Sequence, residues 1–372
     1  MTTEAERLKR EVSSFIAGEP DAERFNALAL ELYRWHVKTM PRYRAFCARR
    51  VGDPLAVRDY RAIPPLPVEA FKYGDLSAVP EAGITRRFST SGTTQRGPTG
   101  RRGVSAFDGD ALDVMDLAIA RNAGNNLFPD GVRCRVFVLA PHPDAAPHMI
   151  MAHGMRHLMN SFGADGSGFF AGKDGIDLPR LLAAIERACE DKTPVCLIGA
   201  SFGFVHLVDT LQSRERLPLL LPARSRLMDA GGYKGRSREL QPEDFRALMT
   251  RSFGLPDDHI INLLGMTELS SQIYDDAFAL AIAGRAIEQR RKFTPHWLRT
   301  HVTSIDDPQR DAAEGELGIL AHYDLANFSR PLALLSDDLG RSVPGGFRIL
   351  SRIKSSEPRG CSVSIDELWR QA

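Results

Sequence analysis

The sequence predicts an α/β protein in which helices flank parallel strands and a small β-rich part lies near the C-terminus. From about residue 130, short apolar and β-branched runs alternate with helical segments, and each run ends in a Gly, Pro or Ser loop. These runs lie at residues 136–140, 194–199, 226–230 and 260–264. Such alternation is typical of a parallel sheet covered on both faces. After about residue 314, apolar runs at 318–323, 332–335 and 347–350 are separated by short turns, which predicts a β-rich region.

The N-terminal part is predicted to be helical. Residues 4–50 carry Phe25, Leu28, Leu32 and Trp35 at helical spacing, and Pro41 interrupts the pattern. The prolines at 64, 65 and 67 exclude a regular element, so this stretch is predicted to be an extended connector. We therefore expect three consecutive segments: a helical segment at 1–60, an α/β core at 61–313 and a β-rich subdomain at 314–372.

The composition is that of a globular protein, and it argues against several classes of function. In 372 residues, 48 basic side chains balance 47 acidic ones for a formal charge of +1, so no footprint for nucleic acid or an anionic membrane is expected. No run of about 20 apolar residues is present, which predicts no membrane span. The charged N-terminus MTTEAERLKR has no apolar segment behind it, which predicts no secretory signal and a cytoplasmic protein.

The five cysteines are odd in number and form no Cys-x-x-Cys pair, which predicts neither a zinc ribbon nor a disulfide framework. Free thiols in a reducing compartment are the simplest interpretation. Four of the five lie in apolar or helical contexts and are expected to be buried: Cys47, Cys134, Cys189 and Cys196.

The fifth cysteine, Cys361, stands in a different setting. It follows Arg359, and Ser364 and Glu367 are spaced like a capping box that opens a short helix. A nearby arginine and a helix N-terminus both lower the pKa of a thiol, so Cys361 is a candidate nucleophile. The alternative is that Cys361 has no chemical role, as is the case for most lone cysteines.

The sharpest local signal is the stretch Phe-Ser-Thr-Ser-Gly-Thr-Thr at 88–94, which we call the Ser/Thr/Gly loop. Its hydroxyls and backbone N–H groups are the donors that wrap phosphate oxygens, and the candidate residues are Ser91, Gly92, Thr93 and Thr94. It is not a Walker P-loop, because no Gly-Lys-Ser/Thr follows. Several arginines nearby could neutralise a polyphosphate. The alternative is a flexible surface loop.

A second signal is the strand-like run at 260–264 followed by Gly265, Thr267 and Glu268. A carboxylate at the carboxyl end of a parallel strand could hold Mg²⁺, a hard cation that prefers oxygen ligands. Alternatively, Thr267 and Glu268 open a helix, because acidic residues favour the first helical turn.

A third signal is an acidic turn predicted at 336–340, after the apolar run. Within it, Asp338 could accept hydrogen bonds from a ribose diol, although Asp-Asp-Leu-Gly is also ordinary turn chemistry. Two weaker constellations have simpler interpretations. His153 and His157 are spaced for one helix face but lack a third metal ligand, so helix packing is expected. Lys234, in a Gly-Gly-Tyr-Lys-Gly turn, could reach an anionic substrate or only connect a strand to a helix.

The order of these motifs resembles that of the adenylate-forming superfamily. A Ser-Gly-Thr-Thr loop is followed by Gly-Gly-x-Lys, Gly-Met-Thr-Glu, Asp-Asp-Leu-Gly and a late arginine. The stretch Arg-Ile-Lys-x-x-Glu-x-Arg-Gly-Cys-Ser at 352–362 and the segment Pro-Leu-Pro-Val-Glu-Ala-Phe-Lys at 65–72 are similar to the LuxE-type acyl-protein synthetases, which are related to phenylacetate-CoA ligase-like enzymes.

The resemblance implies ATP and Mg²⁺ as cofactors, and it implies a role for each candidate residue. Ser91, Gly92, Thr93 and Thr94 would hold the phosphates, and Gly265 and Thr267 would also bind ATP. Glu268 would bind Mg²⁺, Asp338 the ribose and Arg352 the nucleotide, while Cys361 would accept the acyl group. Fuller members carry a C-terminal domain with a catalytic lysine, and we expect this chain to lack it because it ends about twenty residues after Arg352. That leaves Lys234 or a loop arginine to stabilise the transition state.

Three functions are compatible with the sequence. The first is activation of a carboxylic acid, a fatty or other acyl acid, to an acyl-adenylate, followed by thioester formation on Cys361 and transfer to a partner reductase or carrier protein. The second is adenylation with direct transfer to coenzyme A or a carrier thiol, as in phenylacetate-type ligases. The third is a non-catalytic docking subunit that retains the fold.

Overall fold

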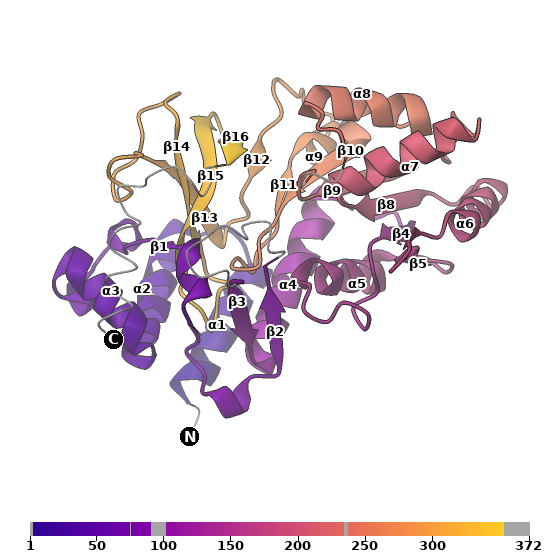
Figure 1. Ribbon diagram of the computed structural model, residues 1–372. Coiled ribbons are helices and arrows are strands. Elements are labelled where there is room, and N and C mark those ends of the chain that lie inside the picture. The colour runs from indigo at the N-terminus through magenta and orange to yellow at the C-terminus, as the bar shows by residue number, and fades with distance from the viewer. Residues whose placement is uncertain (1–2, 75, 91–101, 234–236, 353–372) are drawn as a thin grey trace. The chain divides into compact units, whose positions relative to one another are not determined.

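The computed structural model describes residues 3–74, 76–90, 102–233 and 237–352, and it contains two compact units (Figure 1). Within these limits, the first unit comprises residues 1–118, 266–271 and 292–372, and the second comprises residues 119–265 and 272–291. The units interleave along the chain, and one boundary falls inside helix α4 (Gly109–Asn126). The division into three consecutive segments at 60 and 313 stays a prediction.

The second unit contains the parallel sheet expected from the sequence. Its strands lie in the order β11 (Ile273–Asp275), β10 (Ile260–Leu264), β9 (Arg226–Ala230), β8 (Val195–Gly199), β4 (Arg135–Leu139) and β5 (Gly168–Phe169). All of them run parallel except β11, which pairs antiparallel with β10. The four strands predicted here are confirmed, and each lies within one residue of its predicted ends.

Helices connect these strands and bury both faces of the sheet. They are α5 (Ile150–Phe162), α6 (Leu178–Glu190), α7 (Ser201–Ser213) and α8 (Pro242–Phe253), with α9 (Ala277–Ile282), the turn η5 (Asp257–His259) and the small hairpin β6 (Ala171–Gly172) and β7 (Gly175–Ile176) at the periphery. Figure 1 shows α7 and α8 on one side of the strands and α5 on the other. Accordingly, Phe137 and Leu197 pack into the core of α6, α7 and α8, whereas their neighbours Val136 and Ile198 are buried on the other face.

The first unit begins with the predicted helical region, which forms α1 (Glu4–Ala17), α2 (Ala22–Thr39) and α3 (Pro41–Val51). A capping box between Thr3 and Glu6 starts α1, and Pro41 starts α3 at a position where its missing N–H costs nothing. Four short 3-10 turns follow at η1 (Pro54–Ala56), η2 (Tyr60–Ala62), η3 (Val68–Lys72) and η4 (Glu81–Gly83).

The β-rich part of the first unit is an antiparallel sheet. Strands β13 (Leu298–Thr303), β14 (Gly318–Asp324), β15 (Ala333–Val343), β16 (Gly346–Arg352) and β12 (Lys292–Phe293) lie in that order, and β1 (Leu66–Pro67) runs parallel beside β15. A separate hairpin joins β2 (Arg86–Ser89) and β3 (Val104–Phe107).

Two predictions about local structure were wrong. The acidic turn expected at 336–340 is instead the middle of β15, because the backbone there pairs with β14 and β16, which outweighs the turn preference of Asp-Asp-Leu-Gly. Cys189 is exposed, whereas Cys47, Cys134 and Cys196 are buried as predicted. Ala188 faces the core of the second unit, and the next helical residue points about 100° away from it.

Candidate functional site

Thr90, the third residue of the Ser/Thr/Gly loop, pairs with Gly103 at the end of the β2–β3 hairpin. The Thr90 N–H donates to the Gly103 carbonyl oxygen at 2.9 Å, and the Gly103 N–H donates to Thr90 Oγ1 at 3.1 Å. These bonds extend the β2–β3 hairpin by one residue pair, and we call this pair the hairpin mouth. Ser91, Gly92, Thr93 and Thr94 themselves lie outside the described residues, as do Lys234 and Cys361.

Glu268 packs directly against the hairpin mouth. A Cβ atom added to Gly103 would lie 3.3 Å from Glu268 Oε1, 3.2 Å from Thr90 Cγ2 and 3.6 Å from Phe71 Cβ. A methyl group at position 103 would therefore be a tight fit, and the Glu268 carboxylate and the Thr90 methyl would have to shift slightly. The structure thus brings together the predicted metal ligand and the ends of the predicted phosphate loop, which are far apart in the sequence.

The alternative interpretation of Glu268, as an acid that opens a helix, was wrong. Residues 265–271 form turns and irregular backbone, with Gly265 exposed and Thr267 half-buried just before Glu268. Glu268 is 7% exposed, and burial raises the pKa of its carboxyl group to about 7. The charges of Arg352 and Lys72 lower this pKa, and the charge of Asp337 raises it. A carboxyl group that is costly to ionise therefore sits at the hairpin mouth.

A buried polar network holds the segment that follows Glu268. Asn327 donates from Nδ2 to the Glu268 carbonyl oxygen at 3.1 Å and accepts the Ser270 N–H at Oδ1 at 2.8 Å. Asp324 accepts the N–H and the hydroxyl of Ser271 at 2.9 and 2.8 Å. Burial raises the pKa of Asp324 to about 6 in spite of these hydrogen bonds. Asp324 is the last residue of β14, and Asn327 lies in the connection from β14 to β15.

Arg330 adds a buried positive charge to this network. Its guanidinium carbon lies 3.7 Å from the centroid of the Phe107 ring on β3, and Nη2 donates to Ser270 Oγ and, at 3.2 Å, to Asn327 Oδ1. Burial lowers the pKa of Arg330 to about 9, while Asp324, Glu268 and Asp108 raise it. Within the described residues, Nε and Nη1 of Arg330 have no hydrogen-bond partner.

Gly103, Asp324, Asn327 and Arg330 were not among the site residues predicted from the sequence. A usable signal was present, because Asp324, Asn327 and Arg330 are polar residues between two strongly apolar strand runs. Polar groups in such a place are retained only when they find partners.

Asp338 and Arg352 lie opposite each other on β15 and β16. Arg352 Nε is 3.7 Å from Asp338 Oδ1, and the Asp338 N–H donates to Ser336 Oγ at 3.1 Å. Burial raises the pKa of Asp338, the Arg352 charge lowers it and Asp337 raises it. Arg352 is 62% exposed in its side chain, so it is accessible to a ligand. The two residues predicted to contact the nucleotide are therefore neighbours, and both carry charges that act on Glu268 or on each other.

The second unit has a polar cluster at the carboxyl ends of its parallel strands. Ser201 Oγ donates to Asp229 Oδ2 at 2.7 Å, and Asn262 Nδ2 donates to the same oxygen at 3.0 Å. The Asn262 N–H donates to Asp275 Oδ2 at 2.7 Å. This is the edge of the sheet where ligands of parallel sheets bind. His153, on α5, is buried, and no group of three or more His, Cys, Asp or Glu in the described parts of the chain is arranged to hold a metal.

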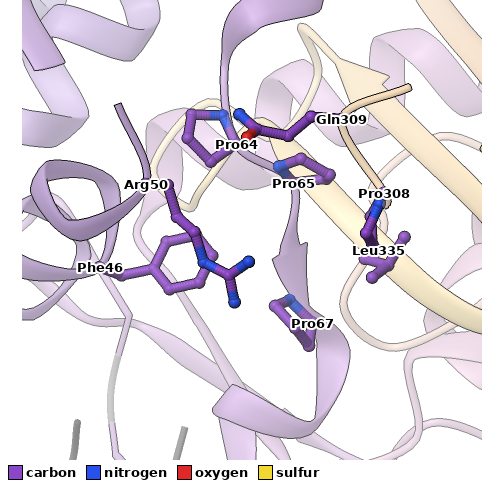
Figure 2. A pocket seen from close by; sticks show the side chains of 8 residues that line it. All are labelled: Phe46, Arg50, Pro64, Pro65, Pro67, Pro308, Gln309 and Leu335. Atoms are coloured by element: carbon purple, nitrogen blue, oxygen red, sulfur yellow. The ribbon is translucent and has the colours of Figure 1, made fainter. Parts of the chain in front are cut away.

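A small pocket in the first unit lies between α3, the proline-rich connector and β15 (Figure 2). It is lined by Phe46, Arg50, Pro64, Pro65, Pro67, Pro308, Gln309 and Leu335, and its volume of about 10 Å³ is room for roughly one water molecule. None of the residues around Glu268 lines it. We therefore regard it as a packing feature of the connector and not as a substrate site.

The fold is that of the acid–thiol ligases that form adenylates. A structure of 2-hydroxyisobutyryl-CoA ligase in an open conformation, in complex with 2-HIB-AMP and CoA, has a TM-score of 0.62 and 16% identity, and the match covers 92% of this chain and 78% of that chain. The same ligase in its thioesterification state has a TM-score of 0.63 and 16% identity, with 91% and 71% of the two chains covered. At this identity, the likeness shows the fold alone.

The sequence relatives define the family within that class. The model of the family "Acyl-protein synthetase, LuxE" matches residues 14–369, so the chain belongs to this family and is an enzyme of the ligase class. A long-chain-fatty-acid–luciferin-component ligase of Aliivibrio fischeri is 24% identical over 364 residues, which cover 93% of this chain and 89% of that protein. Its namesake in Vibrio harveyi is 24% identical over 351 residues, or 91% and 86% of the two chains. The non-catalytic interpretation is therefore set aside. No helix in the described residues has the length and apolar character to cross a membrane.

Proposed function

We propose that this enzyme activates a fatty acid with MgATP, carries the acyl group as a thioester on Cys361 and hands it to a partner protein. The observation that carries the proposal is the Glu268 carboxylate at the hairpin mouth, beside the ends of a loop rich in Ser, Thr and Gly. An acidic group next to a set of hydroxyl and N–H donors suits a nucleotide whose phosphates arrive with a divalent cation.

Glu268 fits a magnesium site of the usual kind. Mg²⁺ is commonly bound by one or two carboxylates together with substrate phosphates, so it does not need a cage of three protein acids. Burial makes the Glu268 carboxyl group costly to ionise, and a bound cation would lower that cost. When bound, Mg²⁺ would neutralise phosphate charge. The protein contributes the oxygen ligand and holds it in place through Asn327.

In the first half-reaction, a carboxylate oxygen of the acid attacks the α-phosphorus of ATP. The bond from that phosphorus to the bridging oxygen breaks, and pyrophosphate leaves with the electron pair. The donors at Ser91–Thr94 stabilise the charge on the phosphate oxygens, which is the main contribution a protein makes to such a step. Gly265 and Thr267 take part in binding ATP, while Asp338 accepts from the ribose diol and Arg352 contacts the nucleotide.

In the second half-reaction, the Cys361 thiolate attacks the carbonyl carbon of the acyl-adenylate and AMP leaves with its oxygen. The acyl group is then a thioester on the enzyme, ready for transfer to a reductase or carrier protein. We propose a fatty acid as the substrate because the two relatives are named as ligases of long-chain fatty acids and a luciferin component. A cytoplasmic location is part of the proposal, since the exposed thiol of Cys189 suits a reducing compartment.

Carboxylate-dependent exchange of labelled pyrophosphate into ATP, measured across acids of different chain length, tests the first half-reaction. We expect exchange with fatty acids and none without an acid. Absence of exchange with every acid would contradict the proposal.

A second candidate is direct transfer of the acyl group to coenzyme A or a carrier thiol. It is favoured by the fold likeness to a ligase whose structures contain CoA together with an acyl-adenylate. Labelling with radioactive acid and ATP separates the two. A hydroxylamine-sensitive label on the wild type that Cys361→Ser lacks supports the thioester, and normal adenylation without label on either protein supports the second candidate.

A further inference from the structure

Three positive side chains act on Glu268 among the described residues: Arg352, Arg330 and Lys72. Two of them already have other roles. Arg352, opposite Asp338, is assigned to another part of the nucleotide, and Arg330 is buried on the Phe107 ring with Ser270 and Asn327 as partners. A nucleotide that binds here meets the carboxylates of Glu268 and Asp337, so its phosphates need a further cation that can turn towards them.

Lys72 is such a cation. Its side chain is 15% exposed, and Nζ lies 3.3 Å from Glu69 Oε1, one turn earlier on η3. The ammonium is therefore held near the site by a single weakly bonded carboxylate, at the end of a flexible four-carbon stem. Rotation about the bonds of that stem allows the ammonium to turn away from Glu69.

The fold places Lys72 there through rigid elements. Leu66 and Pro67 form β1, which pairs with Leu334 and Leu335 of β15, and η3 follows directly. The prolines of the connector pack against α3 and the 308–309 loop, as Figure 2 shows, and proline rings fix the backbone φ angle. At the other end, Phe71 contacts the hairpin mouth, where its Cβ and Glu268 Oε1 flank the same side of Gly103.

We propose that Lys72 is a catalytic residue of the adenylation step, in which its ammonium contacts the α- and β-phosphate oxygens of ATP at the hairpin mouth. This inference rests on the proposed function. As the carboxylate oxygen bonds to the α-phosphorus and the bond to pyrophosphate breaks, negative charge grows on the leaving oxygens. Lys72 stabilises that charge by hydrogen bonding and keeps its own protons, so it needs no base. It would thereby serve in place of Lys234 or a loop arginine.

The competing explanation is that Lys72 only forms a structural ion pair with Glu69, and matched variants of the full chain separate the two. Lys72→Gln removes the charge but leaves an amide that can still bond Glu69, and Lys72→Met removes both. Glu69→Gln breaks the same ion pair while keeping the lysine. Lys72→Arg keeps a cation. Each variant is assayed for pyrophosphate exchange, for affinity to ATP and to adenosine by equilibrium dialysis, and for its thermal midpoint.

We expect Lys72→Gln and Lys72→Met to lose about 100-fold in the exchange kcat, the usual effect of deleting one preorganised donor, with the KM for the acid unchanged. Lys72→Arg should recover a tenth or more of the rate, and Glu69→Gln should stay within about threefold of wild type. Wild-type exchange by Lys72→Gln, or an equal loss in Glu69→Gln, would overturn the inference while the proposed function stands.

If the wild type shows no pyrophosphate exchange with any acid tested, the proposed function fails. The affinities for ATP and adenosine then test whether Lys72 contacts the phosphates. A tenfold weaker affinity of Lys72→Gln for ATP, with unchanged affinity for adenosine, supports a phosphate contact. Equal ATP affinity in the variant and the wild type overturns it.

Discussion

Replacing Glu268 with glutamine should make the protein more stable and less active. Glutamine keeps the size of the side chain but removes a charge that burial disfavours. Burial raises the pKa of Glu268 from an ordinary 4.5 to about 7, and each pKa unit corresponds to roughly 1.4 kcal/mol. The ionised carboxylate therefore destabilises the fold by about 3 kcal/mol above pH 7.

The pH dependence follows from the direction of this shift. Between about pH 4.5 and pH 7, the folded state keeps the Glu268 proton while the unfolded state has lost it. The folded state binds more protons in that window, so the stability contributed by protonated Glu268 is present below pH 4.5 and is lost as the pH rises through 7. Glu268→Gln has no such loss.

Urea unfolding at two pH values measures the effect. We expect Glu268→Gln to exceed wild type by about 3 kcal/mol in unfolding free energy at pH 8, and by about 1 kcal/mol at pH 5. The exposed Glu288→Gln is the control and should change stability by less than about 0.5 kcal/mol at either pH. In the pyrophosphate-exchange assay, Glu268→Gln should be slower and should need more Mg²⁺.

Equal stability of wild type and Glu268→Gln at pH 8 would refute the argument that this carboxylate is desolvated at a cost. A stabilised variant with wild-type Mg²⁺ dependence would instead leave the burial argument intact and remove Glu268 from the metal site. The two readouts therefore test the packing and the chemistry separately.

Four further predictions concern the surroundings of the site. Thr93→Val should lose about 2–4 kcal/mol of transition-state stabilisation in pyrophosphate exchange, and an unchanged rate would remove the loop from phosphate binding. Gly103→Ala places a Cβ 3.3 Å from Glu268 Oε1, so pyrophosphate exchange should fall roughly tenfold while the thermal midpoint barely changes. Full activity of this variant would show that the position of Glu268 does not depend on close packing against Gly103. Asn327→Leu leaves three backbone groups without this partner, the Ser270 N–H and the carbonyl oxygens of Glu268 and Pro331, and should cost about 3 kcal/mol in urea unfolding; a loss below about 1 kcal/mol would contradict the role given to the network. Cys361→Ser should form acyl-adenylate but carry no hydroxylamine-sensitive label, and equal label on both proteins would place the thioester elsewhere.

Much of the fold was predictable because short-range sequence patterns, such as apolar runs and helical spacing, indicate its strands and helices. The strands of the second unit are apolar runs bounded by glycine and proline, and a strand buried on both faces needs such a run whatever lies beside it. The helices of the first unit show their buried face at helical spacing in Phe25, Leu28 and Leu32. The order of the motifs was sufficient to indicate the family, since each motif is a local string.

The conformation around the polar motifs was not predictable in the same way. Asp-Asp-Leu-Gly has a turn preference that β14 and β16 override by pairing with its backbone on both sides. Thr267 and Glu268 look like a helix start, but Asn327 and Asp324 bind the following backbone and hold it in a turn. In both places the deciding partner comes from a distant part of the chain.

The sequence by itself therefore determined the class of fold, most strands of the parallel sheet, and the residue types available for binding a nucleotide. Only the tertiary structure decided that Glu268 meets the hairpin mouth across Gly103, that its pKa is raised by burial, and that Lys72 and Arg330 bring positive charge to it. The physical reason is that burial and charge interactions depend on which segments become neighbours in space. Local periodicity records which face of an element is buried, and it carries no information about which polar side chain will lie opposite it.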